Sequence, residues 1–156
     1  MMENKLKNSI RRILDENKLM FLATTNKSKN PESCAVYYCF DEYFNLYFWT
    51  DKDSRHSKNI LKKGEVAVSI ASCSQKWGSF LKGLQIQGKC VEVSKLKIVL
   101  PAKLYMKRFP KVKSLIKNPK DFLKKYDSTM FVIKPKWFKI LDEKTFGREI
   151  WKEAFV

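Results

Sequence analysis

The chain has 156 residues, which is a length typical of one domain. Its 32 Lys and Arg residues against 16 Asp and Glu give a net charge of +16, which favours anionic partners. With 44% hydrophobic and 13% aromatic residues, the composition excludes a disordered chain. None of the five glycines belongs to a GxGxxG or GxxxxGK[ST] motif, which argues against a Rossmann dinucleotide site and a P-loop.

Cellular location and metal binding are constrained by what the sequence lacks. The segment MMENKLKNSIRR has no apolar signal core, and the longest apolar run, residues 34–40, is far shorter than the roughly 18 residues of a membrane span. The four cysteines form no CxxC pair and His56 is the only histidine, so no zinc site is expected. We therefore predict reduced thiols in a cytoplasmic protein without a membrane segment.

The first third of the chain predicts a helix and three strands. Apolar residues fall on one helical face over residues 3–18. A short apolar strand follows at 19–25, and a polar turn rich in Asn, Ser and Pro comes after it. The aromatic-rich runs 33–40 and 44–50 are separated by three polar or turn-forming residues, which predicts a β-hairpin.

The rest of the chain predicts a short helix, three more strands and an insertion. Asp53 or Ser54 can cap a helix over 55–63 that stops before Gly64. Alternating apolar residues predict strands at 65–73, 81–93 and 129–141, with glycines in the second of these marking bulges or close backbone approaches. Short links between the strands favour antiparallel pairing, and six strands favour a closed or partly open barrel in one domain, residues 1–156.

A basic insertion separates the last two predicted strands. Residues 95–125 are helical in character and are interrupted by Pro101, Pro110 and Pro119. They contain eleven Lys and Arg and one Asp, a net charge of +10. This charge is compatible with nucleic-acid binding, but Lys predominates over Arg and no nucleic-acid motif is present. We therefore favour a solvated basic surface and keep nucleic acid as the minority alternative.

Residues 46–56, LYFWTDKDSRH, carry the strongest chemical signal. An apolar strand runs into a turn and then into a helix start, where free N–H groups and the helix dipole favour an anion. Arg55 adds a guanidinium suited to phosphate oxygens, Thr50 and Ser54 add hydroxyls, and Lys58 adds charge one turn later. The pattern predicts a phosphate site. The alternative is an ordinary capped helix with solvated basic side chains.

The pair Trp49–Thr50 and the triplet Ser54–Arg55–His56 are followed by an alternating strand that ends in glycine at 84–88. Across residues 31–69 this arrangement resembles, without gaps, the flavin-binding split barrels related to pyridoxamine 5′-phosphate oxidase. Residues 108–110 and 137–147 are similar to a small bacterial subgroup of these barrels. The resemblance implies a mainly β fold, a six-stranded antiparallel split β-barrel with flanking helices, which binds FMN.

The resemblance also implies where FMN would lie. Its phosphate would contact Arg55, with Thr50 and Ser54 nearby, and His56 replaces the usual lysine of the family. Lys58 would compensate for that loss of charge, and Trp49 belongs to the same site. The flavin ring would lie against the backbone of Cys34, Ala35, Val36 and Tyr37. Gly83 and Leu84 would approach from the partner subunit, because these flavin sites lie between the chains of a homodimer.

Two departures from the family bear on the reaction. Cys39 occupies the position where the oxidase itself has a lysine for the substrate phosphate, and residues 146–156 lack the Arg-x-His element of its longer C-terminal portion. The resemblance therefore implies a flavin-dependent oxidoreductase acting on an unassigned small molecule, rather than a true pyridoxamine 5′-phosphate oxidase. The flavin itself transfers the electrons, so no residue is assigned as catalytic.

The alternative function is a non-enzymatic binding protein. The same barrel would then hold haem, another flavin-like cofactor or nucleic acid, since the fold alone does not select the ligand. The only histidine, His56, stands at the position implied for the phosphate, which argues against an axial haem ligand.

Overall fold

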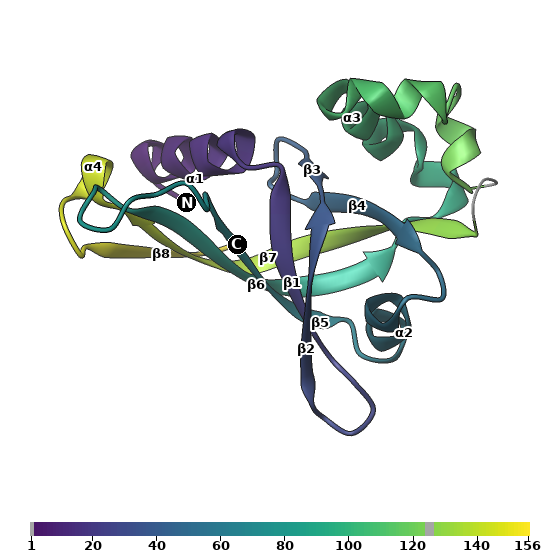
Figure 1. Cartoon of the computed structure of the whole chain (residues 1–156), viewed down its shortest axis with the longest axis horizontal. Helices are drawn as coiled ribbons and strands as arrows, with labels where there is room; N and C mark the ends of the chain where they lie inside the picture. Colours follow the sequence, from purple (N-terminus) through teal and green to yellow (C-terminus); the bar gives the residue numbers. More distant parts are fainter. Residues whose placement is uncertain (1, 124–126) are drawn as a thin grey trace.

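The computed structural model describes residues 2–123 and 127–156, in which helices flank one curled antiparallel sheet of eight strands (Figure 1). The strands are β1 (Leu19–Thr25), β2 (Pro31–Tyr37), β3 (Cys39–Phe40), β4 (Leu46–Asp51), β5 (Glu65–Ala71), β6 (Lys82–Glu92), β7 (Ser128–Asp142) and β8 (Trp151–Phe155). The helices are α1 (Asn4–Glu16), α2 (Arg55–Lys62), α3 (Val99–Arg108) and α4 (Glu143–Phe146). This confirms the predicted mainly β fold and its six strands. The run 33–40 is divided between β2 and β3, and β8 is added.

The sheet closes on itself at Tyr38. Neighbouring strands follow the order β2-β1-β5-β6-β7-β4-β3, with β8 beside β7. The two ends of this series, β2 and β3, are consecutive in the chain and are joined by Tyr38 alone. The Tyr38 ring is fully buried, and its hydroxyl donates to the carbonyl of Leu14 at 2.9 Å. The sheet therefore curls until its two edges meet, which gives a split barrel.

The predicted hairpin between residues 33–40 and 44–50 is largely wrong. All seven residues of β2 pair with β1, and only Cys39 and Phe40 pair with β4. The side chain of Asn26 accepts hydrogen bonds from the backbone N–H of Ser28 and Asn30, which fixes the turn between β1 and β2. An unbroken apolar run does not indicate which of two nearby strands it pairs with.

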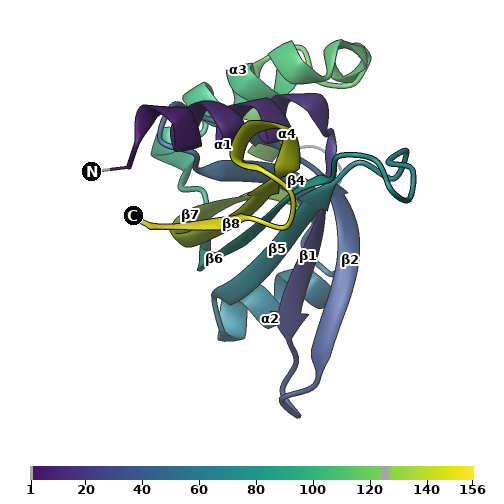
Figure 2. The ribbon, with the colours of Figure 1, turned by 90° about the vertical axis from the view of Figure 1, so that its left-hand side faces the viewer.

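Helices close the two ends of the barrel. The α1 face of Leu6, Ile10, Ile13 and Leu14 is buried, as predicted, and packs on the barrel core. In Figures 1 and 2, α1 lies above the sheet and α2 lies below it. None of the helices in the described ranges is long and apolar enough to cross a membrane.

The basic insertion packs on the outer side of the barrel wall. It contains α3 and the 3-10 segments η1 (Lys95–Lys97), η2 (Pro110–Ser114) and η3 (Pro119–Leu123), while Lys124 and Lys125 lie outside the described residues. Ile98, Ala102, Tyr105, Ile116 and Phe122 form a second core with Met130 and other residues of the wall.

The three prolines of the insertion differ in their effects. Pro110 and Pro119 begin 3-10 segments, as expected of helix interruptions. Pro101 is the third residue of α3, where a helix leaves its N–H groups without intrahelical partners, so it does not interrupt the helix.

Candidate cofactor site

The site begins where β4 ends and α2 starts. Ser54 is the residue that caps α2: its hydroxyl accepts from the backbone N–H of Ser57 at 3.3 Å. The hydroxyls of both serines lie within 2.9 Å of the carbonyl oxygen of Asp51, which is the last residue of β4. These bonds hold the turn and fix the first residues of α2 beside the end of β4.

Thr50 and His56 meet inside this turn. The His56 Nε2 lies 2.7 Å from the Thr50 hydroxyl oxygen and 3.1 Å from the Ser54 hydroxyl oxygen. Burial lowers the pKa of His56, and the nearby Asp51 carboxylate opposes this only in part. The imidazole is therefore neutral at neutral pH and acts here as a hydrogen-bonding group rather than as a fixed charge.

Arg55 forms an ion pair with Glu32 of β2. Glu32 also accepts hydrogen bonds from Asn26 at 3.0 Å and from Asn59 at 2.9 Å. The Asn26 bond, the Asn59 bond and Arg55 together hold the pKa of Glu32 below its usual value, so the carboxylate is charged. The Arg55 side chain remains 82% exposed. The sequence analysis missed Glu32 and Asn59. The sequence could have indicated Glu32, because it precedes Cys34 by two residues and therefore lies on the same face of the strand.

A hollow of about 440 Å³ lies in front of these groups and is lined by Thr24, Glu32, Ser33, Cys34, Arg55 and His56. A second hollow of about 540 Å³ shares Glu32 and Arg55 with it and includes Lys58. Lys58 is exposed and pairs with Asp53 at 3.4 Å. The structure therefore brings together Cys34, Thr50, Ser54, Arg55 and His56, with Lys58 in the neighbouring hollow.

Strand β2 leads away from this hollow at the edge of the sheet. It pairs with β1 on one side and stands last in the strand order. Cys34 and Val36 are half-buried and pack against the barrel core, whereas Ala35 and Tyr37 are exposed on the other face. The Tyr37 ring packs edge-on against Phe109 at 5.4 Å.

Trp49 lies on the opposite face of β4 from Thr50. Its ring packs edge-on against Phe122 of the insertion at 5.0 Å and belongs to the second core. The structure therefore does not bring Trp49 together with the residues at the start of α2, because successive side chains of a strand point to opposite faces.

Gly83 and Leu84 lie far from the hollow in the same chain. Thr129 of β7 pairs with Thr50, and Leu141, twelve residues further along the same strand, pairs with Gly83. At about 3.3 Å per residue, roughly 40 Å of strand lies between the two pairings. Leu84 as a whole is 1% exposed, whereas Gly83 is half-buried, so Gly83 is the more accessible of the two within one chain.

Comparison with known proteins shows the family of the chain. The family model described as pyridoxamine 5′-phosphate oxidase matches residues 6–141, most of the chain. The chain belongs to this family. None of the curated proteins matches the sequence.

Solved structures share the fold of this oxidase family member at low sequence identity. General stress protein 26 from Bacillus anthracis str. Sterne is 20% identical with a TM-score of 0.68, covering 97% of this chain and 98% of its own. A heme binding protein from Mycobacterium smegmatis is 12% identical with a TM-score of 0.79, covering 99% of this chain but 60% of its own. HutZ, a heme storage protein from Vibrio cholerae, is 16% identical with a TM-score of 0.67, covering 83% of this chain and 89% of its own.

The residues at the start of α2 fit the phosphate of the flavin that this oxidase family implies. Arg55 and His56 line one hollow, and the hydroxyls of Thr50 and Ser54 contact the His56 Nε2. The exposed guanidinium of Arg55 can donate charge-assisted hydrogen bonds to phosphate oxygens. The Glu32 carboxylate lines the same hollow and holds Arg55, so a phosphate must share that guanidinium with it. Arginine carries five N–H donors, which permits both contacts.

Proposed function

We propose that the protein binds FMN, with the phosphate at the start of α2. The observation that carries this proposal is that Arg55 and His56 line one hollow beside the edge strand β2, with the hydroxyls of Thr50 and Ser54 in contact with His56. In this arrangement Arg55 binds the phosphate, with the hydroxyls of Thr50 and Ser54 nearby. The backbone of residues 34–37 lies along the flavin ring.

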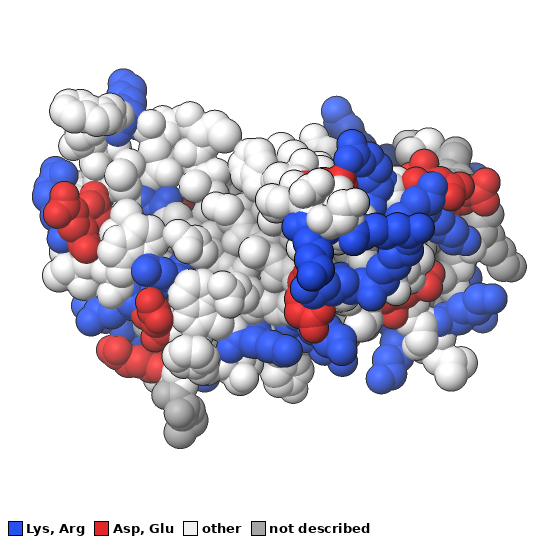
Figure 3. Space-filling model, turned by 90° about the horizontal axis from the view of Figure 1, so that it is seen from below, with Lys and Arg blue, Asp and Glu red and all other residues white. Residues whose placement is uncertain are grey.

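The same proposal includes a homodimer with the flavin between its two chains. One ligand reaches both the start of α2 and the backbone of Gly83 only if a second chain supplies Gly83, because β7 separates the two groups within one chain. The outer face of the sheet favours such a partner. A shallow hollow there is lined by uncharged residues, among them Phe21, Ala67 and Trp137. In Figure 3 a broad area without charged side chains occupies the middle of the face, and Lys and Arg are densest toward the right of it.

The proposed activity is that of an FMN-dependent oxidoreductase acting on a small molecule other than pyridoxamine phosphate. When bound, FMN supplies hydride or electron transfer, and the protein contributes binding and orientation. Cys39, which stands in place of the oxidase lysine, is 2% exposed, and burial raises the pKa of its thiol to about 12. It therefore offers no charge to a substrate phosphate. Turnover of pyridoxamine phosphate at the rate of an authentic oxidase would contradict this part of the proposal.

Reconstitution tests the cofactor directly. The purified protein is incubated with FMN, desalted and examined by visible absorption, and its mass in solution is measured by sedimentation. We expect a retained two-band flavin spectrum on a dimer. Riboflavin, which has the same ring without the phosphate, is the matched control and should be lost on desalting. A colourless protein after FMN treatment, or equal retention of riboflavin, would argue against a phosphate site at α2.

Haem is the second candidate, favoured by the two structural neighbours whose names describe heme binding or storage. The only histidine of the chain lines the hollow, but its Nε2 already contacts the hydroxyls of Thr50 and Ser54. An axial bond from that nitrogen would have to displace both contacts. The absorption experiment repeated with haem separates the two cofactors, because haem gives an intense band near the blue edge of the visible range that FMN lacks.

A further inference from the structure

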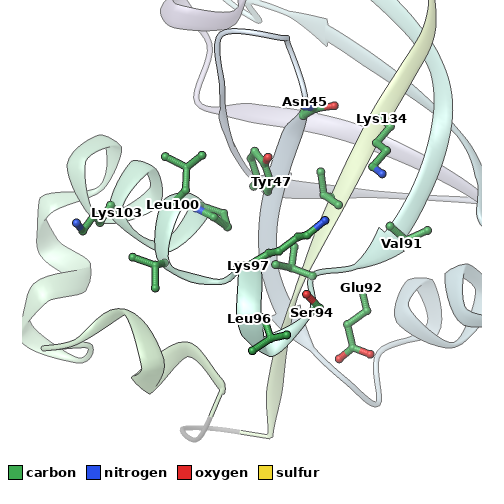
Figure 4. Close-up of a pocket in the computed structure, with 14 residues that line it drawn as sticks. Asn45, Tyr47, Val91, Glu92, Ser94, Leu96, Lys97, Leu100, Lys103 and Lys134 are labelled. Atoms are coloured by element: carbon green, nitrogen blue, oxygen red, sulfur yellow. The ribbon is translucent and has the colours of Figure 1, made fainter.

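A cleft of about 710 Å³ separates the basic insertion from the barrel wall (Figure 4). One side is formed by η1 and α3, and the other by the outer faces of β4, β6 and β7. Its volume lies within the range of about 300–1,000 Å³ that is usual for small-molecule sites.

The walls of this cleft expose apolar side chains. Leu96, Leu100, Val99 and Val91 are 94%, 58%, 42% and 37% exposed, and all four line the cleft. Apolar residues scattered singly over a surface need no explanation, but a group of them around one concavity is typical of a binding site. These walls would bury the apolar body of a ligand.

Two lysines supply positive charge at the same place. In Figure 4 the side chains of Lys97 and Lys134 point toward one another across the cleft, whereas Lys103 points away from it. Within residues 2–123 and 127–156, neither Lys97 nor Lys134 forms an ion pair. Glu92, the one carboxylate that lines the cleft among the described residues, accepts a hydrogen bond from the Thr129 hydroxyl. Two like charges that converge without an ion-pair partner favour an anion between them.

This cleft is separate from the proposed flavin site. Tyr47 lines the cleft, and Thr50 contacts His56 of the hollow at α2; the odd spacing between Tyr47 and Thr50 places them on opposite faces of β4. A ligand in the cleft therefore contacts neither Arg55 nor His56 of the same chain.

We propose that the cleft binds an organic anion with an apolar body, of the class of medium-chain carboxylates. The carboxylate lies between the ammonium groups of Lys97 and Lys134. The alkyl chain lies against Leu96, Val99 and Leu100. Neither feature alone defines this class: the lysines select the charge, and the apolar walls select the chain.

Calorimetric titration of the full-length protein with decanoate tests the proposal, with decanol and acetate as probes that lack the charge and the chain, respectively. We expect decanoate to bind more tightly than either. The double variant Lys97→Ala/Lys134→Ala should weaken decanoate binding by at least about tenfold, since two charge-assisted hydrogen bonds are lost. Lys103→Ala, which removes a lysine of the same cleft that points away, is the matched control.

Three outcomes would overturn the proposal. They are no decanoate binding by the parent protein, equal binding of decanol, or an equal loss of affinity in Lys103→Ala and in the double variant. Leu100→Ser tests the apolar wall independently, because a side chain that is 58% exposed contributes little to folding. FMN retention should be unchanged in all of these variants. A negative result for the cleft would therefore not contradict the proposed flavin site.

Discussion

The Nε2 atom of His56 lies 2.7 Å from the hydroxyl oxygen of Thr50, and this contact joins the end of β4 to the first turn of α2. The family resemblance implies a lysine at this position, which would carry a fixed charge. Here the position carries a half-buried imidazole whose pKa is lowered by burial. The phosphate site proposed for this chain therefore depends on Arg55 for its permanent positive charge.

The lowered pKa of His56 predicts a loss of stability on mild acidification. The unfolded chain binds a proton to His56 near pH 6.5, whereas the folded chain resists protonation until a lower pH. Between these two values the unfolded state holds more protons, so the free energy of unfolding falls as the pH falls. One group contributes at most about 1.4 kcal/mol per pH unit, and a half-exposed ring contributes less.

Urea unfolding at pH 7.5 and 5.5 measures this effect, and His56→Gln should reduce the loss between the two values. Glu32, Glu143 and Asp142, whose pKa values are also lowered, titrate in the unfolded chain near or below pH 4.3, outside this window. An identical loss in the parent and the variant would show that His56 is not responsible.

Arg55→Ala should weaken FMN binding by at least about tenfold, because a charge-assisted hydrogen bond contributes roughly 1.5–3 kcal/mol. The variant also leaves the Glu32 carboxylate unpaired beside the phosphate, which adds repulsion. Folding should be unaffected, since the Arg55 side chain is 82% exposed. Fluorescence titration of FMN measures the Kd. Lys52→Ala, which removes an exposed charge from the same turn, is the control. Equal Kd values for FMN in both variants would mean that the phosphate binds elsewhere.

Glu32→Gln should have the opposite effect and lower the Kd for FMN severalfold. The carboxylate competes with the phosphate for Arg55 and repels it, whereas the amide keeps the shape and can still accept from Asn26 or Asn59. Glu42→Gln, a neutralised carboxylate in the turn between β3 and β4, controls for net charge. The same titration applies. Weaker FMN binding in Glu32→Gln would mean that the carboxylate chiefly positions Arg55.

The sequence predicted the elements of the fold better than their pairing. The α1 face was readable because Leu6, Ile10 and Ile13 recur at helical spacing. Periodicity did not predict the pairing of residues 33–40. Apolar residues lie on both sides of Tyr38, so the sequence does not indicate that the chain passes there from one edge of the barrel to the other. Strand period indicates which residues share a face, but not which strand lies alongside.

The candidate site was only partly predictable for a related reason. Ser54 and Arg55 were found because caps and basic residues at a helix start are local signals. Glu32 is 23 residues from Arg55 in sequence, and their ion pair arises only when β2 packs beside α2. The cleft under the insertion was not predicted for the same reason, since Tyr47, Lys97 and Lys134 converge only through folding.

Two glycines of β6 have different roles: Gly88 is needed for packing, and Gly83 has a proposed role in binding. A Cβ added at Gly88 would collide with the carbonyl oxygen of Lys134, at the point where the register with β7 shifts. At Gly83 the nearest atoms would be 3.7 Å away, which is ordinary contact. Gly88→Ala should therefore lower the free energy of unfolding by about 1–3 kcal/mol, and Gly83→Ala should leave it nearly unchanged.

In the proposed dimer, however, the backbone at Gly83 faces the flavin bound to the partner subunit. Gly83→Ala should then weaken FMN binding although the protein is as stable as the parent, and a bulkier Gly83→Val should weaken it further. Urea unfolding and FMN titration on the same preparations separate the two effects. If both Gly83 variants fold normally and bind FMN as the parent does, the flavin does not approach this part of β6. The site would then be confined to residues of a single chain.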